Sequence, residues 1–114
     1  MIGRVGHGTC VLDRDLRYVT ISPWLAALNG FSVADHLGRT IMEVLPAVAA
    51  GVEPVLRGVL ETGEPVLNGI VEAETPAFPD EKRTFKHDYR PVKCSADLVV
   101  GVHCLVQDIT RRAG

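Results

Sequence analysis

Residues 98–112 of the chain read LVVGVHCLVQDITRR, and this stretch decides the fold. Its first part is a run of β-branched and apolar residues, which is the composition of a buried strand. The segment Asp108-Ile109-Thr110 follows at once, and two arginines come after it. A carboxylate and a hydroxyl at this point can cap or pair with neighbouring groups and so hold the chain as it leaves the sheet. The stretch therefore predicts a terminal strand whose exit is either held by these groups or is a plain strand end with a solvated aspartate.

Four other runs of strand-forming residues precede this one. Residues 66–73 and 84–94 are the two nearest, and a long loop is expected between them over residues 75–80 because that segment contains two prolines. Residues 9–12 and 18–21 are short apolar or β-branched runs on either side of a polar turn, so they predict a hairpin.

The middle of the chain predicts helices. Ser22-Pro23 offers an N-cap and a first-turn proline, and Asn29-Gly30 ends this short helix. The pairs Ser32/Asp35 and Thr40/Glu43 resemble capping boxes that open two brief helices. Residues 52–60 keep helical spacing, so a longer helix follows, with a defect expected near residues 51–54 because of Pro54.

Two strands, several helices and three strands in this order indicate an α+β domain. We expect an antiparallel sheet of five strands, with the short helices and the one longer helix packed on one face. A chain of 114 residues, of which 46% are hydrophobic, can bury one core of this kind.

Charge and composition restrict the partners. The formal charge of −2 lacks the excess of basic residues that phosphate contacts need, so we expect no nucleic-acid partner. No apolar run is long enough to span a membrane and no signal peptide is evident, which predicts a cytoplasmic module without direct membrane insertion. Three cysteines, an odd number, do not suggest a disulfide framework.

The chain resembles a PAS domain, a small sensory module of bacterial signalling proteins, from about residue 9 to residue 112. The segments that carry the resemblance are residues 12–19, 28–30, 36–40, 61–65, 89–92, 100–102 and 108–110. The similarity is greatest to modules found beside histidine kinases, diguanylate cyclases and PP2C-type serine phosphatases. It implies a flexible segment over residues 1–8, a sensor domain over 9–110, and the start of a connector to an output domain over 111–114.

The last hairpin predicts which side chains face the helices. If Ala96-Asp97 is its loop, Cys94 lies opposite Val99 and Tyr89 lies opposite Cys104. Alternation then assigns one set to the inner face: Phe85, His87, Tyr89, Val102, Cys104 and Val106. The outer face receives Lys86, Asp88, Arg90, Val99, His103, Leu105 and Gln107.

The ligand-pocket candidates combine this inner set with apolar residues of the helices. They are Trp24, Leu28, Met42, Phe85, His87, Tyr89, Val102, Cys104 and Val106. His87 is the most interesting polar group, because its ring offers one donor and one acceptor to a ligand. The alternative is a core histidine that bonds a backbone carbonyl.

The cofactor remains unknown from the sequence. In flavin photosensors of the light-oxygen-voltage type, which the chain resembles at residues 38–40, the reactive cysteine falls on Ile41 here and the flavin-contacting glutamine on Val106. Haem-sensing members use a histidine of the long helix, and residues 47–61 contain none. A solitary His36 or His87 is weak evidence for iron, and no metal site is predicted.

No motif predicts an enzyme. The chain lacks CxxC, HExxH and GxGxxG patterns, and no motif turns one of its serines into a nucleophile. In the predicted register Cys94 and Cys104 are about 16 Å apart, at about 3.3 Å per residue, which is too far for a disulfide. Any catalysis would belong to a fused output domain.

Two further predictions concern the end of the last strand and the outer face of the sheet. The resemblance implies that Asp108, Thr110 and Arg111 pass a conformational change to an output domain. Val99, His103 and Leu105 would leave an apolar strip on the outer face, which predicts a homodimer. We therefore expect a sensory module of a two-component or similar system that binds a small molecule or a partner. The alternative is a ligand-free module that serves dimerisation.

Overall fold

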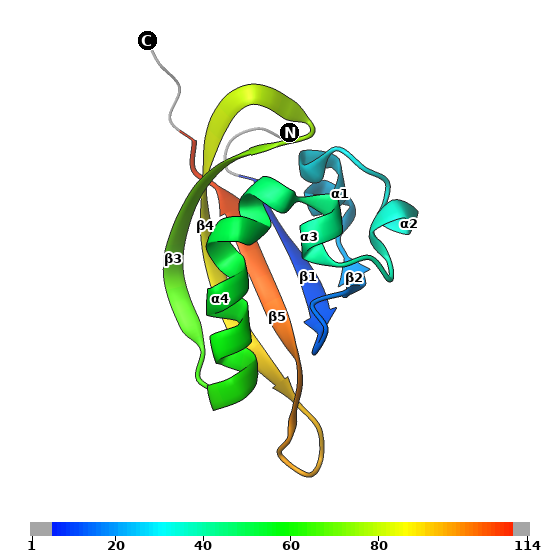
Figure 1. Cartoon of the computed structure of the whole chain (residues 1–114), viewed down its shortest axis with the longest axis vertical. Helices are drawn as coiled ribbons and strands as arrows, with labels where there is room; N and C mark the ends of the chain where they lie inside the picture. The colour runs from blue at the N-terminus through cyan, green and yellow to red at the C-terminus, as the bar shows by residue number, and fades with distance from the viewer. Residues whose placement is uncertain (1–5, 111–114) are drawn as a thin grey trace.

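The computed structural model describes residues 6–110 and has a five-stranded antiparallel sheet in the order β2-β1-β5-β4-β3. Figure 1 shows the helices on one side of this curved sheet. The α+β fold with helices on one face, predicted from the order of the elements, is confirmed. The strands are β1 (His7–Asp13), β2 (Tyr18–Ile21), β3 (Val66–Thr75), β4 (Phe78–Lys93) and β5 (Val99–Asp108).

The strand built from the stretch that decides the fold lies at the centre of the sheet. β5 pairs with β1 on one side and with β4 on the other, so its backbone is satisfied along both edges. β1 begins at His7, inside the segment that the sequence predicted to be flexible, because its first residues pair with the end of β5: His7 lies opposite Gln107.

The short helices are α1 (Pro23–Asn29), α2 (Val33–His36) and α3 (Ile41–Val44), and each begins at a side-chain cap. The Ser22 hydroxyl accepts hydrogen bonds from the backbone N–H groups of Leu25 and Thr9, so it joins α1 to β1. Thr40 and Glu43 form the predicted capping box at α3. Such caps matter because helices of one or two turns are marginal without them.

The long helix α4 (Pro46–Thr62) lies across the concave face of the sheet (Figure 1). It is helical from Pro46 to Thr62 with Pro54 in its interior, so the helix neither begins nor ends in the predicted defect region over residues 51–54. A proline inside a helix removes one hydrogen bond and costs about 3 kcal/mol. Burial of Val52, Leu56 and Val59 against the sheet offsets this cost.

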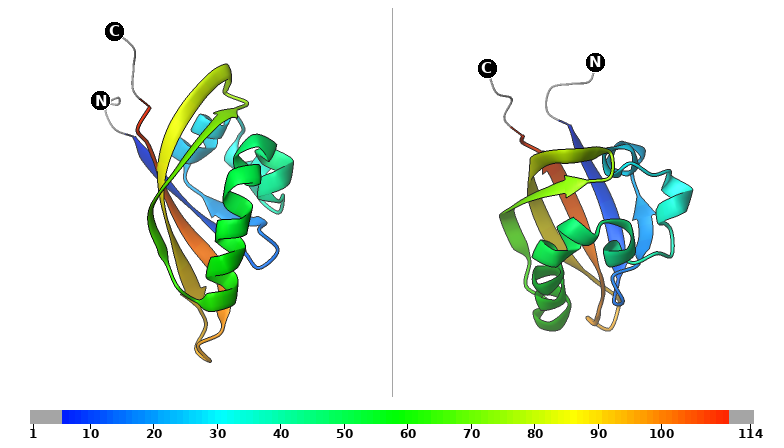
Figure 2. Two further views of the ribbon diagram at one scale, coloured as in Figure 1. Left: turned by 60° about the vertical axis from the view of Figure 1, so that its left-hand side comes forward. Right: turned by 45° about the horizontal axis from the view of Figure 1, so that its top comes forward.

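The connection between β3 and β4 is a tight turn rather than the predicted long loop over residues 75–80. β3 continues to Thr75 and β4 starts at Phe78, which lies opposite it. Pro79 fits because β5 pairs with β4 only from Phe85 onward, so this part of β4 has one free edge, and the ladder to β3 is irregular there. Figure 2 shows this hairpin curling over the side of the sheet that carries the helices.

The β4–β5 hairpin has the predicted register over most of its length. Tyr89 lies opposite Cys104 as predicted, but a bulge at Val92/Lys93 places Val99 opposite Lys93 instead of Cys94. Because of the bulge, the first residues of β5 point to the side of the sheet opposite to the one predicted. Val99 packs against the core and Val100 is 44% exposed, so the assignment of Val99 to the outer, dimer-forming face is wrong.

The core lies between the sheet and the helices. Its most enclosed side chains include Leu12, Leu56 and Val102, each with 0% relative exposure. Among the described residues, no helix is both long and apolar enough to cross a membrane.

Candidate functional site

A small cavity of about 50 Å³ lies inside this core, between the sheet and the helices. Leu25 and Leu28 of α1, Ile41 of α3 and Leu56 of α4 contribute apolar walls on the helical side. The sheet contributes aromatic rings and thiols. The volume is a sixth or less of that of the pockets of about 300–1,000 Å³ that hold drug-sized ligands.

Six of the predicted pocket residues line this cavity. They are Leu28, Phe85, His87, Tyr89, Cys104 and Val106. The inner-face assignment of the last hairpin accounts for five of them, since its register is confirmed over these residues. That they bind a ligand remains a prediction.

Three predicted pocket residues lie elsewhere. Met42 is 44% exposed, because α3 turns Ile41 and Val44 inward and Met42 outward, so its assignment to the pocket is wrong. Trp24 is half-buried against the core and does not line the cavity. Val102 is fully buried but packs away from the cavity.

Sequence reasoning missed four polar residues of the lining: Cys10, Tyr18, Asn29 and Thr75. Cys10 faces Cys104 directly across the β1–β5 ladder, and this pairing follows from the sheet order, which the sequence did not predict. The Asn29 amide donates to Nε2 of His36 over 3.1 Å, and His36 Nδ1 donates to the Ser32 carbonyl over 2.8 Å. Asn29 ends α1 and Thr75 ends β3, so a polar residue at the end of an element was the sequence signal that could have identified them.

His87 has the least satisfied polar atom in the lining. Its side chain is 5% exposed, and its Nδ1 is enclosed without a hydrogen-bond partner among the described residues. The ring stacks on Tyr89 with centroids 4.2 Å apart and planes inclined by 9°. On β3, a Cβ at Gly69 would lie 2.2 Å from Cε1 of His87, so the absence of a side chain at Gly69 makes room for the ring.

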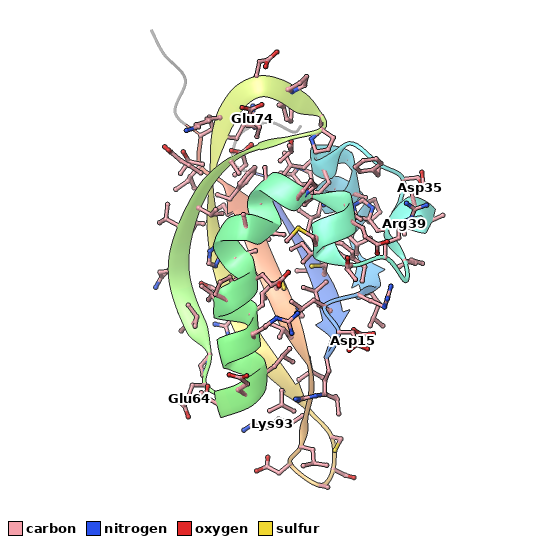
Figure 3. The ribbon with its side chains drawn as sticks, in the orientation of Figure 1. Asp15, Asp35, Arg39, Glu64, Glu74 and Lys93 are labelled. Carbon is pink, nitrogen blue, oxygen red and sulfur yellow. The ribbon has the colours of Figure 1, made fainter. Side chains whose placement is uncertain are left out.

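Burial keeps the cavity walls uncharged. It lowers the pKa of His87, although Asp88 opposes this shift, and it raises the pKa values of Tyr18 and Tyr89. The neighbouring Cys10 thiol and burial together raise the pKa of the Cys104 thiol. Among residues 6–110, the lining contains no Asp, Glu, Lys or Arg side chain. Figure 3 shows labelled charged side chains around the outline of the molecule: Asp15, Asp35, Arg39, Glu64 and Lys93.

The predicted exit residues form a hydrogen-bonded cluster at the end of β5. The Asp108 carboxylate accepts from Nε and Nη2 of Arg83 over 3.0 and 2.6 Å, and from the backbone N–H of Thr110 over 2.9 Å. The Thr110 hydroxyl accepts from the N–H of Thr84 over 2.9 Å. The Arg83 guanidinium lies 4.0 Å from the centre of the Phe78 ring. We call Phe78, Arg83, Asp108 and Thr110 the exit cluster.

Burial raises the pKa of Asp108, but hydrogen bonds from Thr110 and Arg83 outweigh it, so the net pKa is lower than usual. The exit cluster therefore contains an ionised, charge-assisted pair at neutral pH. Arg111 and the predicted connector over residues 111–114 lie outside the described residues.

The remaining dimer-face candidates lie on the outer face of the sheet. His103 and Leu105 are half-buried there, opposite Val11 and Thr9 of β1. Whether this surface forms a homodimer remains a prediction.

A family model described as PAS fold matches residues 4–114. The chain therefore belongs to the PAS family, and the resemblance found in the sequence is confirmed. No curated protein sequence matches the chain.

Three solved structures illustrate the similarity of fold. A VqmA–ligand–DNA complex from Vibrio cholera has a TM-score of 0.76 and 23% identity, covering 96% of this chain and 49% of that chain. A sensory box sensor histidine kinase from Vibrio cholerae has a TM-score of 0.73 and 16% identity, covering 94% and 84%. The PAS domain of a protein from Colwellia psychrerythraea has a TM-score of 0.75 and 16% identity, covering 93% and 88%.

The exclusion of nucleic-acid partners needs correction. VqmA structures include a complex with DNA and a complex with DPO. This chain spans about half of the VqmA chains that it matches. A fold of this kind therefore occurs as one part of a DNA-binding receptor. The charge argument fails because it considers only direct contacts of this domain and not those of a chain that contains it.

Proposed function

We propose that this PAS domain is a sensory module that takes a small molecule into the cavity and passes the change to an output domain through the exit cluster. The family and the sensor histidine kinases of the same fold support a sensory role. Ligand binding and transmission are the two parts that need testing.

The observation that carries the proposal is the short path between cavity and exit. Phe85 lines the cavity and lies directly opposite Asp108 across the β4–β5 ladder. The preceding residue, Thr84, accepts a hydrogen bond at its carbonyl from the N–H of Ile109, and its own N–H donates to the Thr110 hydroxyl. A shift of Phe85 would therefore move the backbone that holds the exit cluster.

The size of the cavity makes such a shift necessary. A cavity of about 150 Å³ accommodates benzene, and this one has about 50 Å³. A ligand larger than a few atoms must displace the walls, and close-packed cores move in discrete steps rather than by gradual deformation. Ligand and exit are coupled if the ligand binds the displaced state more tightly, by about 1–3 kcal/mol in typical systems.

The first experiment screens the purified domain against a metabolite set by thermal shift and then by NMR. A ligand should raise the melting temperature and shift the resonances of Phe85 and His87. It should also shift Ile109 and Thr110, and the variant Asp108→Asn should keep binding but lose part of that second response. Binding without any response at residues 108–110 would contradict transmission.

The alternative is a ligand-free module that serves dimerisation, and the small cavity favours it. In that case the metabolite set gives no thermal shift, and sedimentation of the domain depends on its concentration. A substitution on the outer face, such as Leu105→Lys, would then abolish association.

The output is proposed in general terms only. A histidine kinase or a DNA-binding domain, in a bacterial cytoplasmic protein, is consistent with the neighbours of the same fold. Expression of the full-length protein with Asp108→Asn would show which output activity becomes insensitive to the ligand.

A further inference from the structure

The cavity lining contains an unsatisfied polar atom inside a wall that carries no ionised group. Buried polar atoms almost always have a partner, and one left without a partner destabilises the folded protein. Nδ1 of His87 is such an atom, in a side chain that is 5% exposed and lines the cavity. The ring edge that carries Nδ1 packs against Gly69 of β3, so a ligand that widens the cavity and turns this ring away from Gly69 would give Nδ1 a partner and relieve the destabilisation.

The ring of His87 is held in place without any ligand. It stacks on Tyr89, and Gly69 on the neighbouring strand leaves only enough space for the ring. A displacement of this ring would therefore change the cavity wall and the accessibility of Nδ1 together.

The charge of the ligand follows from the rest of the lining. Tyr18, Asn29, Thr75 and Tyr89 are neutral, and in the part of the chain that the structure describes no Lys, Arg, Asp or Glu side chain lines the cavity. An ion transferred from water into such a space lacks a counter-charge, and its desolvation costs several kcal/mol. Carboxylates, phosphates and ammonium ions are therefore disfavoured.

From these observations, and resting on the proposed function, we infer that the cavity selects small uncharged molecules with one hydroxyl or amide group, which hydrogen-bonds Nδ1 of His87. A hydroxyl can donate or accept, so it serves either tautomer of the imidazole. The remainder of the ligand is apolar, to match Leu28, Val71 and Phe85.

Three probes of similar size test this class of ligand by NMR titration: phenol, toluene and benzoate. Phenol should bind the wild-type domain and shift the ring-nitrogen resonances of His87. Benzoate should bind at least tenfold more weakly than phenol, because its charge has no partner in the cavity.

Variants separate the hydrogen bond from general hydrophobic binding. His87→Phe should weaken phenol binding about tenfold and toluene binding less than twofold, since one hydrogen bond is lost only for phenol. His87→Asn should restore part of the phenol affinity, because its amide retains a hydrogen-bonding group near the position of Nδ1. The control His103→Asn changes a histidine on the outer face and should leave both affinities unchanged.

The outcomes distinguish this inference from the proposed function. Equal losses for phenol and toluene in His87→Phe, or benzoate binding as tightly as phenol, would overturn the ligand class while leaving ligand sensing intact. If none of the probes shifts His87 or Phe85, the inference is also overturned. The metabolite screen then decides the proposed function independently, because it includes charged compounds.

Discussion

At the scale of single residues, the site depends on small groups that make room for larger ones. His87 can lie flat on Tyr89 only because Gly69, opposite it on β3, has no side chain. Gly30 at the end of α1 has φ of 94°, and a Cβ there would lie 2.8 Å from the backbone nitrogen of Ala77 in the β3–β4 turn. Gly69 therefore makes room for a ring of the cavity wall, and Gly30 lets the end of α1 lie close to the β3–β4 turn.

The substitution Gly69→Ala tests the packing of His87. The added methyl group would lie 2.2 Å from Cε1 of His87, so the ring must leave its stacked position. We expect a loss of about 1–3 kcal/mol in the free energy of unfolding, as in other overpacked cores. Urea denaturation measures the loss, and the ring-current shifts of His87 and Tyr89 report the altered stacking.

The matched control is Gly58→Ala in α4, where an added Cβ meets nothing within 4 Å. Replacing a helical glycine with alanine stabilises by about 0.5–1 kcal/mol. If Gly69→Ala were equally stabilising, the tight packing of His87 against β3 would be disproved.

At the scale of secondary-structure elements, the β4–β5 hairpin determines both the cavity wall and the exit. The alternation of apolar residues predicted the inward direction of Phe85, His87 and Tyr89 correctly, because a buried sheet face permits only one register. The bulge at Val92/Lys93 could not be predicted, because it depends on a four-residue turn over residues 94–97 in which Asp97 adopts a positive φ of 63°.

The bulge predicts different responses at two neighbouring valines. Val99→Lys places a charge among the core side chains beside α4 and should destabilise the domain by about 2–3 kcal/mol. Val100→Lys adds the same charge to an exposed position and should change stability by less than about 0.5 kcal/mol. Thermal or urea unfolding of the two variants compares them directly. Larger damage from Val100→Lys would indicate the unbulged register instead.

The exit cluster predicts a pH dependence of stability. The pKa of Asp108 is lower in the folded protein than in the unfolded chain, so its contribution is complete above pH about 4 and is lost as the pH falls through the folded-state pKa. Asp108→Asn should therefore cost about 1–2 kcal/mol at pH 7, allowing for solvent screening of a partly exposed pair.

The difference between wild type and Asp108→Asn should shrink as the pH falls below about 4, because the wild-type carboxyl then becomes protonated. Unfolding by urea at a series of pH values measures it. A difference that stays constant down to pH 2 would mean that the ionised form of Asp108 makes no stabilising contact.

At the scale of the whole molecule, the order of the elements was sufficient to predict the fold class. Segregated strands and helices with clear caps leave few alternatives for a chain of this length. The cavity was less predictable. Its lining joins side chains from all five strands and three helices. The meeting of Cys10 with Cys104 requires β1 to lie beside β5, which no local pattern in either strand encodes.

Local sequence information was also insufficient for two predictions that were wrong: the inward position of Met42 and the exclusion of nucleic-acid partners. A one-turn helix such as α3 is too short for its apolar pattern to reveal the inward side, so the sequence could not show that Met42 faces outward. The charge of one domain describes its own surface only. It gives no information on what a longer chain containing the domain binds.

The central claim is that filling the cavity alters the exit of β5, and amide hydrogen exchange tests it most directly. Exchange at Ile109 and Thr110 is measured with and without saturating phenol, or with a ligand found in the metabolite screen. We predict at least a fivefold change in exchange rate at these two amides, because Thr84 and Asp108 couple them to Phe85. A filled cavity, proven by shifts at His87, with unchanged exchange at residues 109 and 110 would contradict the account.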